Sequence, residues 1–129
     1  MSVLQGLQDR AAARPAHIVL SEGHDPRVVA GAVSAVQAGI ARITLVGTTD
    51  EVHRQLADMG ATIGPMIAVE DPQTSSLTDE FAQTYFDLRK HKGISEDIAA
   101  TQARDPLVFA AMMVRNGHAD GTVGGAVAT

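Results

Sequence analysis

Cysteine and tryptophan are missing from this sequence, and aromatic residues are scarce. Without cysteine the chain can form no disulfide, no thiol nucleophile and no cysteine-ligated metal site. Aromatic residues make up only 3% of the chain, so aliphatic side chains must fill the core. This composition suits helices packed on buried parallel strands better than an aromatic-rich β-sandwich.

A surplus of positive charge and a long hydrophobic run are also missing. The formal net charge is -5 at pH 7, whereas a nucleic-acid-binding protein normally carries a basic surplus or a basic stripe. No stretch approaches the ~20 apolar residues that cross a membrane, and the N-terminus contains no apolar run of signal-peptide length. The sequence therefore predicts a cytoplasmic protein that binds neither nucleic acid nor membrane.

Strand-like and helix-like segments alternate along the chain. The predicted strands are 17–20, 43–46, 66–69 and 121–123. Apolar residues at helical spacing follow the first strands, and Asp25 with Pro26 predicts the start of the first helix. Such alternation predicts a parallel sheet with right-handed crossover helices.

Three helices are expected between the third and fourth strands. One begins at Ser76, Ser95 caps a short second helix, and Asp105 with Pro106 opens the third. The third helix, 107–116, is apolar nearly all round, which is typical of a helix buried between two layers.

Three cations and a histidine lie together at 88–93 (LRKHKG) in an otherwise acidic chain. Arginine can bind a phosphate through two parallel hydrogen bonds, so this run is a candidate phosphate clamp. The helix dipole also favours basic residues at a helix C-terminus, and an ordinary solvated helix end is the simpler interpretation of the spacing alone.

Glycines follow the last predicted strand, at Gly124 and Gly125. Glycines after a strand let backbone N–H groups approach a ligand, although many such turns only redirect the chain. The segment is neither a P-loop nor a dinucleotide-binding fingerprint.

The segment after the first strand lies at the sheet edge where open α/β sheets bind ligands. Glu22 is able to orient a ligand there, whereas Asp25 is expected to cap a helix and His24 to be a loop residue. The other histidines show no metal-ligand spacing, no Ser/His/Asp triad can be argued, and no metal site is predicted. They are His17, His53 and His118.

Four segments resemble the phosphate acetyltransferase and butyryltransferase family, and they occur in the family's order. They are 19–28 (VLSEGHDPRV), 43–47 (ITLVG), 88–93 (LRKHKG) and 105–125 (DPLVFAAMMVRNGHADGTVGG). The last two are quite specific together, and the resemblance spans roughly 16–129. It implies a three-layer αβα fold with a mostly parallel sheet, related to isocitrate and isopropylmalate dehydrogenases.

The resemblance also implies a reaction, in which acetyl phosphate and coenzyme A give acetyl-CoA and phosphate. The thiol of coenzyme A is deprotonated and attacks the acetyl carbonyl, with no metal and with coenzyme A as substrate rather than cofactor. Family members are usually homodimers of two-domain chains. Residues 1–129 are expected to be the N-terminal part of the first domain, without the second domain and the C-terminal part.

Site residues can be carried over by position from the family. Arg89 matches an arginine implicated in binding the phosphates of coenzyme A, and Lys92 is expected to add positive charge there. Gly125, Ala126 and Thr129 match the start of a loop that faces the substrate cleft. The sheet rim is expected to bring these two groups together around a phosphorylated ligand.

The family's thiol-activating Asp and its neighbouring Ser and Arg lie downstream of residue 129, so the catalytic residues are unknown within this chain. Acyl transfer needs a base and donors for the oxyanion, and the isolated chain is therefore expected to be inactive. The chain ends before the helix that should follow the last strand, which indicates a fragment; a frayed natural terminus is the alternative. Because a sheet without its later strands exposes an edge and apolar surface, we expect self-association.

Three other functions stay open at this stage. One is a phosphate butyryltransferase, since the chain lacks much of the acyl pocket. Another is the non-catalytic, acyl-CoA-sensing transacetylase-like domain of a malic enzyme, although LRKHKG favours a true transacetylase. The third is a phosphate-ligand binding module without catalysis.

Overall fold

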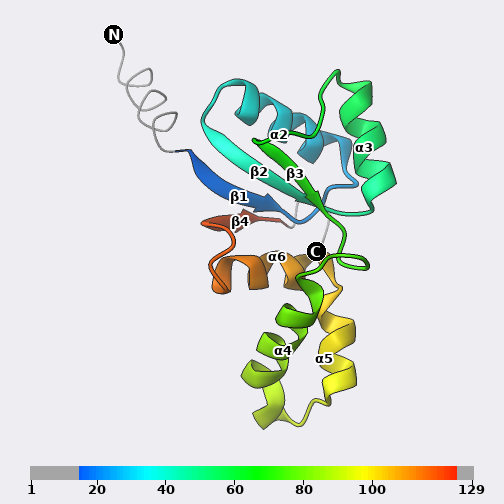
Figure 1. The fold of residues 1–129 in the computed structure, drawn as a ribbon, viewed down its shortest axis with the longest axis vertical. Coiled ribbons are helices and arrows are strands. Elements are labelled where there is room, and N and C mark those ends of the chain that lie inside the picture. The colour runs from blue at the N-terminus through cyan, green and yellow to red at the C-terminus, as the bar shows by residue number, and fades with distance from the viewer. Residues whose placement is uncertain (1–14, 125–129) are drawn as a thin grey trace.

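The computed structural model describes residues 15–124, whose strands and helices alternate as the sequence predicts (Figure 1). The strands are β1 (Ala16–Leu20), β2 (Ala41–Val46), β3 (Ile67–Glu70) and β4 (Gly121–Val123). The helices are α2 (Pro26–Gln37), α3 (Thr49–Asp58), α4 (Thr78–Arg89), the 3-10 turn η1 (Lys90–Lys92), α5 (Glu96–Ala103) and α6 (Pro106–Arg115). Each strand lies within two residues of its predicted position.

The four strands form one parallel sheet in the order β3-β2-β1-β4. The chain first winds outward from β1 through β2 to β3, and then returns to pair β4 with the opposite side of β1. Leu20 pairs with Leu45 on one side and with Val123 on the other, so the carboxyl ends of three strands lie level.

Helices cover both faces of the sheet, and this gives the three-layer αβα fold. On one face, α2 and α3 pack around Ile43, Leu45 and Leu56, which are buried. On the other face, Val19 and Phe109 belong to a second core that α6 and α4 complete. Figure 1 shows α6 between the sheet and α4, with α2 and α3 on the opposite side. The predicted fold class is confirmed.

Helix α6 begins at the predicted residue but is buried on one side only. Phe109 and Met113 are buried, whereas Leu107 is 45% exposed and Ala111 is exposed. The Asp105 carboxylate accepts a hydrogen bond from the Val108 backbone at 3.2 Å, as expected of an N-cap. The predicted position between two layers is confirmed, because α6 lies between the sheet and α4, although part of its apolar surface stays exposed.

Helix α4 begins two residues later than the sequence predicts. The Ser75 hydroxyl donates to the Glu70 carboxylate and accepts from the backbone N–H of Leu77, so this serine stabilises a turn rather than the helix start. The Thr78 hydroxyl donates to the Pro72 carbonyl at 2.7 Å. Local side-chain hydrogen bonds of this kind compete with helix formation, so the helix begins at a later residue.

Helices α4 and α5 form a hairpin that projects away from the sheet beyond α6 (Figure 1). Ser95 caps α5 by accepting from Ile98 N at 3.1 Å. Within the described part of the chain, no helix is both long and apolar enough to span a bilayer.

Candidate functional site

The carboxyl ends of β1 and β4 lie side by side where the winding of the sheet reverses. Leu20 and Val123 are in register, and the Ser21 backbone N–H donates to the Val123 carbonyl at 3.4 Å. Open α/β sheets bind ligands outside the carboxyl ends of their strands at such a reversal. The loop after β1 and the backbone at Gly124 therefore form the first part of a candidate site.

The loop after β1 is held in one conformation by close packing. The Gly23 N–H donates to the Val46 carbonyl at 3.0 Å, and a Cβ at this position would lie 2.8 Å from the same oxygen. Asp25 caps α2 by accepting from the Arg27 backbone at 2.9 Å, and it also accepts from the Arg27 guanidinium at 2.8 Å. Hydrogen bonds from the Arg27 side chain and backbone lower the pKa of the Asp25 carboxyl. Both predictions here are confirmed, because Asp25 is a cap and His24 is an exposed loop residue.

Two polar side chains at this edge are buried, Ser21 at 1% exposure and Glu22 at 5%. Among the described residues, the Ser21 hydroxyl has no hydrogen-bond partner. It lies directly beneath Gly124, where a Cβ would come within 2.1 Å of Ser21 Oγ. Nothing in the sequence pattern indicated that Ser21 would be buried.

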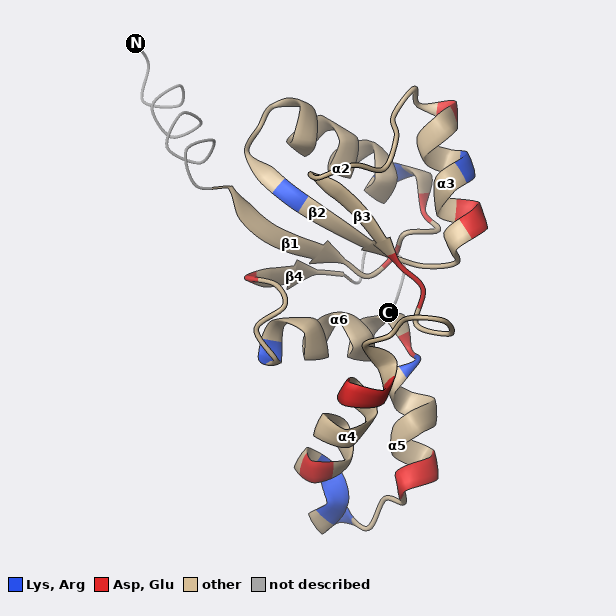
Figure 2. Cartoon of the chain, viewed as in Figure 1, with Lys and Arg blue, Asp and Glu red and all other residues tan. Residues whose placement is uncertain are grey.

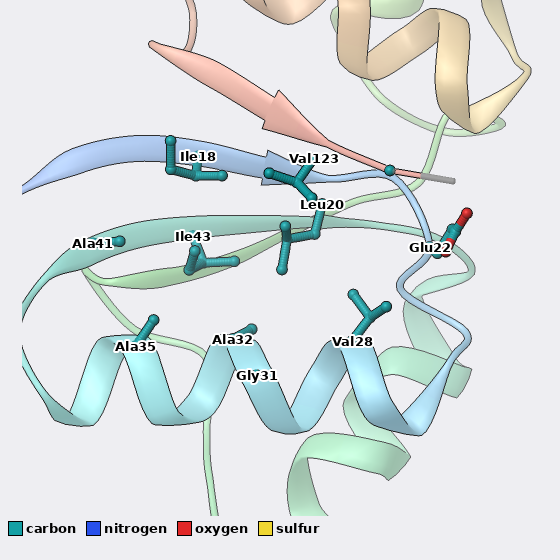
Figure 3. A pocket seen from close by; sticks show the side chains of 11 residues that line it. Ile18, Leu20, Glu22, Val28, Gly31, Ala32, Ala35, Ala41, Ile43 and Val123 are labelled. Atoms are coloured by element: carbon teal, nitrogen blue, oxygen red, sulfur yellow. The ribbon is translucent and has the colours of Figure 1, made fainter. Parts of the chain in front are cut away.

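An apolar groove of about 380 Å³ runs from this edge along α2 (Figure 3). Its walls are Ile18 and Leu20 of β1, Val123 of β4 and the small residues of α2. Of the described residues that line it, Glu22 alone is charged. The described lining offers almost no polar partner for a phosphate. Val123 is 63% exposed, so apolar surface is left open on the described structure, as the sequence predicted.

The basic run lies at the tip of the hairpin, where α4 ends and η1 begins (Figure 2). Arg89 and Lys92 are exposed. The Arg89 guanidinium carbon lies 5.5 Å from the centre of the Tyr85 ring, a cation–π distance. Lys90 Nζ lies 4.0 Å from Asp87 Oδ1, a solvent-exposed pair that contributes little stability. The tip therefore keeps exposed cations that can bind an anion, and we name it the basic tip (89–92).

The structure separates the basic tip from the sheet edge. Figures 1 and 2 show the tip at the far end of the hairpin, beyond α6, whereas β4 ends beside β1 in the sheet. The sequence predicted that the basic run and the glycine turn meet at one rim of the sheet. In the structure, the basic tip and Gly124 lie apart. The predicted site residues Gly125, Ala126 and Thr129 lie outside the described residues. The reason is the direction of α4, which runs away from the sheet and carries the tip with it (Figure 1).

Two of the scattered histidines have structural partners. His17 Nε2 lies 2.7 Å from Thr44 Oγ1, and Arg42 Nη2 lies 3.1 Å from His17 Nδ1. Partial burial, followed by the Arg42 charge, lowers the pKa of the His17 imidazole. His118 Nε2 lies 2.8 Å from Glu80 Oε2. Sequence reasoning missed this last contact, because its partners are 38 residues apart and neither belongs to a recognisable motif.

Comparison with known proteins gives one consistent result. The family model for phosphate acetyl/butaryl transferase matches residues 2–129. The chain belongs to this family. A phosphate acetyltransferase of Paracoccus denitrificans is 40% identical over 129 residues, which are all of this chain and 36% of the relative. One from Clostridium acetobutylicum is 32% identical over 129 residues, 38% of its length.

Solved structures of family members have the same fold. A phosphotransacetylase from Streptococcus pyogenes superposes with a TM-score of 0.86 at 28% identity, covering 100% of this chain and 40% of that one. The EutD phosphotransacetylase from Staphylococcus aureus gives 0.84 at 28% identity, covering 98% of this chain and 38% of that one. The chain thus spans 36–40% of the length of these family members.

Proposed function

We propose that this chain is part of a phosphate acetyltransferase, which moves an acetyl group between coenzyme A and phosphate. The match of the family model across 2–129 carries this proposal, together with relatives of up to 40% identity that bear this name. The substrates are then coenzyme A or acetyl-CoA, acetyl phosphate and phosphate. The relatives named above are all acetyltransferases, which favours acetyl over butyryl transfer.

We assign binding of the coenzyme A phosphates to Arg89 and Lys92. The basic tip is cationic and exposed in a chain of net charge -5. An anion therefore has its most favourable electrostatic interaction at this tip. Arginine presents a planar fork of donors to phosphate oxygens, and lysine adds a point charge. Coenzyme A is long, with its phosphates far from its thiol, so the tip and the sheet edge can contact opposite ends of one substrate.

Gly125, Ala126 and Thr129 continue the chain from Gly124 at the sheet edge, and we propose that they face the substrate cleft there. Residues 1–129 would form the N-terminal part of the first domain of a two-domain enzyme, which works as a dimer in the cytoplasm. Thiol attack needs a base and oxyanion donors. The described residues assemble neither, so we expect the chain alone to be inactive.

A chimera tests the proposed activity. Residues 1–129 replace the matching segment of the Paracoccus denitrificans relative, and acetyl-CoA formation from acetyl phosphate and coenzyme A is measured. We expect turnover by the chimera and none by the 129-residue chain. A chimera that folds, as judged by circular dichroism, but forms no acetyl-CoA would contradict the proposal.

A further inference from the structure

We propose that Glu80 and His118 are positioning residues. Their contact fixes the α4–α5 hairpin against α6, and this hairpin carries the basic tip. Glu80 lies in the first turn of α4, and His118 follows α6 on the way to β4. The importance of this contact for coenzyme A rests on the function proposed above for the tip. The effect of the contact on the hairpin does not depend on that function.

Polar contacts between α4 and the end of α6 are concentrated at one place. The Glu80 carboxylate oxygen Oε2 lies 2.8 Å from His118 Nε2 and accepts from Asn116 Nδ2 at 2.9 Å. Asn116 Nδ2 also donates to Thr84 Oγ1 at 3.0 Å. Glu80 and Thr84 lie one helical turn apart, so the same face of α4 is held at two successive turns. We call these four residues the polar cluster.

The partners of Glu80 are themselves held in place. The His118 backbone N–H donates to the Met113 carbonyl at 2.8 Å, and its ring packs edge-to-face on Phe81 with centroids 5.6 Å apart. The Asn116 backbone N–H donates to the Met112 carbonyl at 2.9 Å. The polar cluster therefore joins α4 to a rigid helix end and not to a free side chain.

The apolar contacts between the hairpin and α6 do not fix its orientation in the same way. Phe81 meets Phe109 edge-to-face with ring centroids 4.9 Å apart, and Tyr85 and Leu88 pack on this core in part. Apolar packing is non-directional, so it resists separation of α4 from α6 more than rotation or tilt. Hydrogen bonds depend steeply on angle and so supply the missing constraint.

Small movements at the polar cluster become larger at the basic tip. Arg89 lies nine residues beyond Glu80 in α4, which is roughly 13 Å along the helix axis. A tilt of roughly 10° about Glu80 would shift the tip by roughly 2 Å over this length, enough to break a bidentate phosphate contact. Among the described helices, only α6 lies between the hairpin and the sheet (Figure 1).

Hydrogen exchange in the 129-residue chain tests the positioning role. In Glu80→Ala we expect backbone amides of 78–103 to exchange about fivefold faster, while amides of α2 and α3 are unchanged. Asp79→Ala is the matched control, since it removes an exposed acid from the same helical turn. Glu80→Gln retains an acceptor for Asn116 and should restore most of the protection. His118→Ala should resemble Glu80→Ala.

Other outcomes overturn the inference. Unchanged exchange in Glu80→Ala, faster exchange throughout the chain, or an equal effect in Asp79→Ala would each show that the contact does not position the hairpin. Titration with coenzyme A separates this result from the proposed function. If the wild-type chain binds it, Glu80→Ala should weaken binding about threefold, because fewer molecules hold the competent arrangement. If the wild-type chain does not bind it, the assignment of the tip fails, and hydrogen exchange still decides the positioning role.

Discussion

Replacing Gly23 by alanine tests whether the loop at the sheet edge has a single permitted geometry. The added Cβ would lie 2.8 Å from the Val46 carbonyl oxygen and 3.2 Å from a Val52 methyl group. The first of these atoms belongs to the backbone of a central strand, so it cannot move aside cheaply. The Gly23 N–H bond to the same carbonyl, 3.0 Å long, would be strained as well.

Overpacking of this kind costs about 1–3 kcal/mol, and alanine recovers part of that by restricting the unfolded chain. We therefore expect Gly23→Ala to lower the free energy of unfolding by about 2 kcal/mol. For a chain of this size the melting temperature should fall by roughly 8 °C. Urea titration and thermal melting followed by circular dichroism measure both quantities.

Gly31→Ala is the matched control for this measurement. Gly31 lies within α2, and a Cβ added there meets nothing within 4 Å. Because glycine is a poor helix former, this variant should gain roughly 0.5–1 kcal/mol. The two substitutions should thus have opposite signs. A Gly23→Ala protein as stable as the wild type would refute the packing described at the sheet edge.

Two further predictions concern the second core and acid stability. Phe109→Ala removes a fully buried ring that meets Phe81, and it should lower the free energy of unfolding by about 3–5 kcal/mol in urea titration; a loss below about 1 kcal/mol would contradict that core. Hydrogen bonds from His118 and Asn116 lower the pKa of the Glu80 carboxyl below 4.5, its usual value. The stabilisation from Glu80 is therefore complete above pH 4.5 and is lost as the pH falls through the lowered pKa of the folded state. The difference in stability between wild type and Glu80→Gln should shrink over that range, and a difference independent of pH would contradict the hydrogen bonds assigned to the Glu80 carboxylate.

The order of the elements could be predicted because its signals are local. Asp25 followed by Pro26 and Asp105 followed by Pro106 are helix-start signals that act through neighbouring backbone groups, and both caps form as expected. The order of the strands in the sheet was not predicted, because it depends on pairing between strands far apart in the chain, such as β1 with β4. The start of α4 was misplaced because Ser75 bonds to Glu70 and Leu77, which an N-cap pattern does not reveal.

The candidate site was only partly predictable. Basic character at 89–92 and glycine at 124 are properties of single residues, and both could be read from the sequence. Their separation depends on the direction of α4 relative to the sheet, which we attribute to contacts such as Glu80 with His118 and Asn116 with Thr84. These contacts join residues far apart in the chain, so no local pattern contains them.

The binding of coenzyme A by the basic tip is tested most directly by steady-state kinetics of the chimera with Arg89→Ala and Arg89→Lys. If Arg89 binds a phosphate of coenzyme A through two hydrogen bonds, KM for coenzyme A should rise at least about tenfold in Arg89→Ala, and lysine should restore only part of it. The kcat value and KM for acetyl phosphate should change little. An unchanged KM for coenzyme A in Arg89→Ala would contradict the assignment of the basic tip.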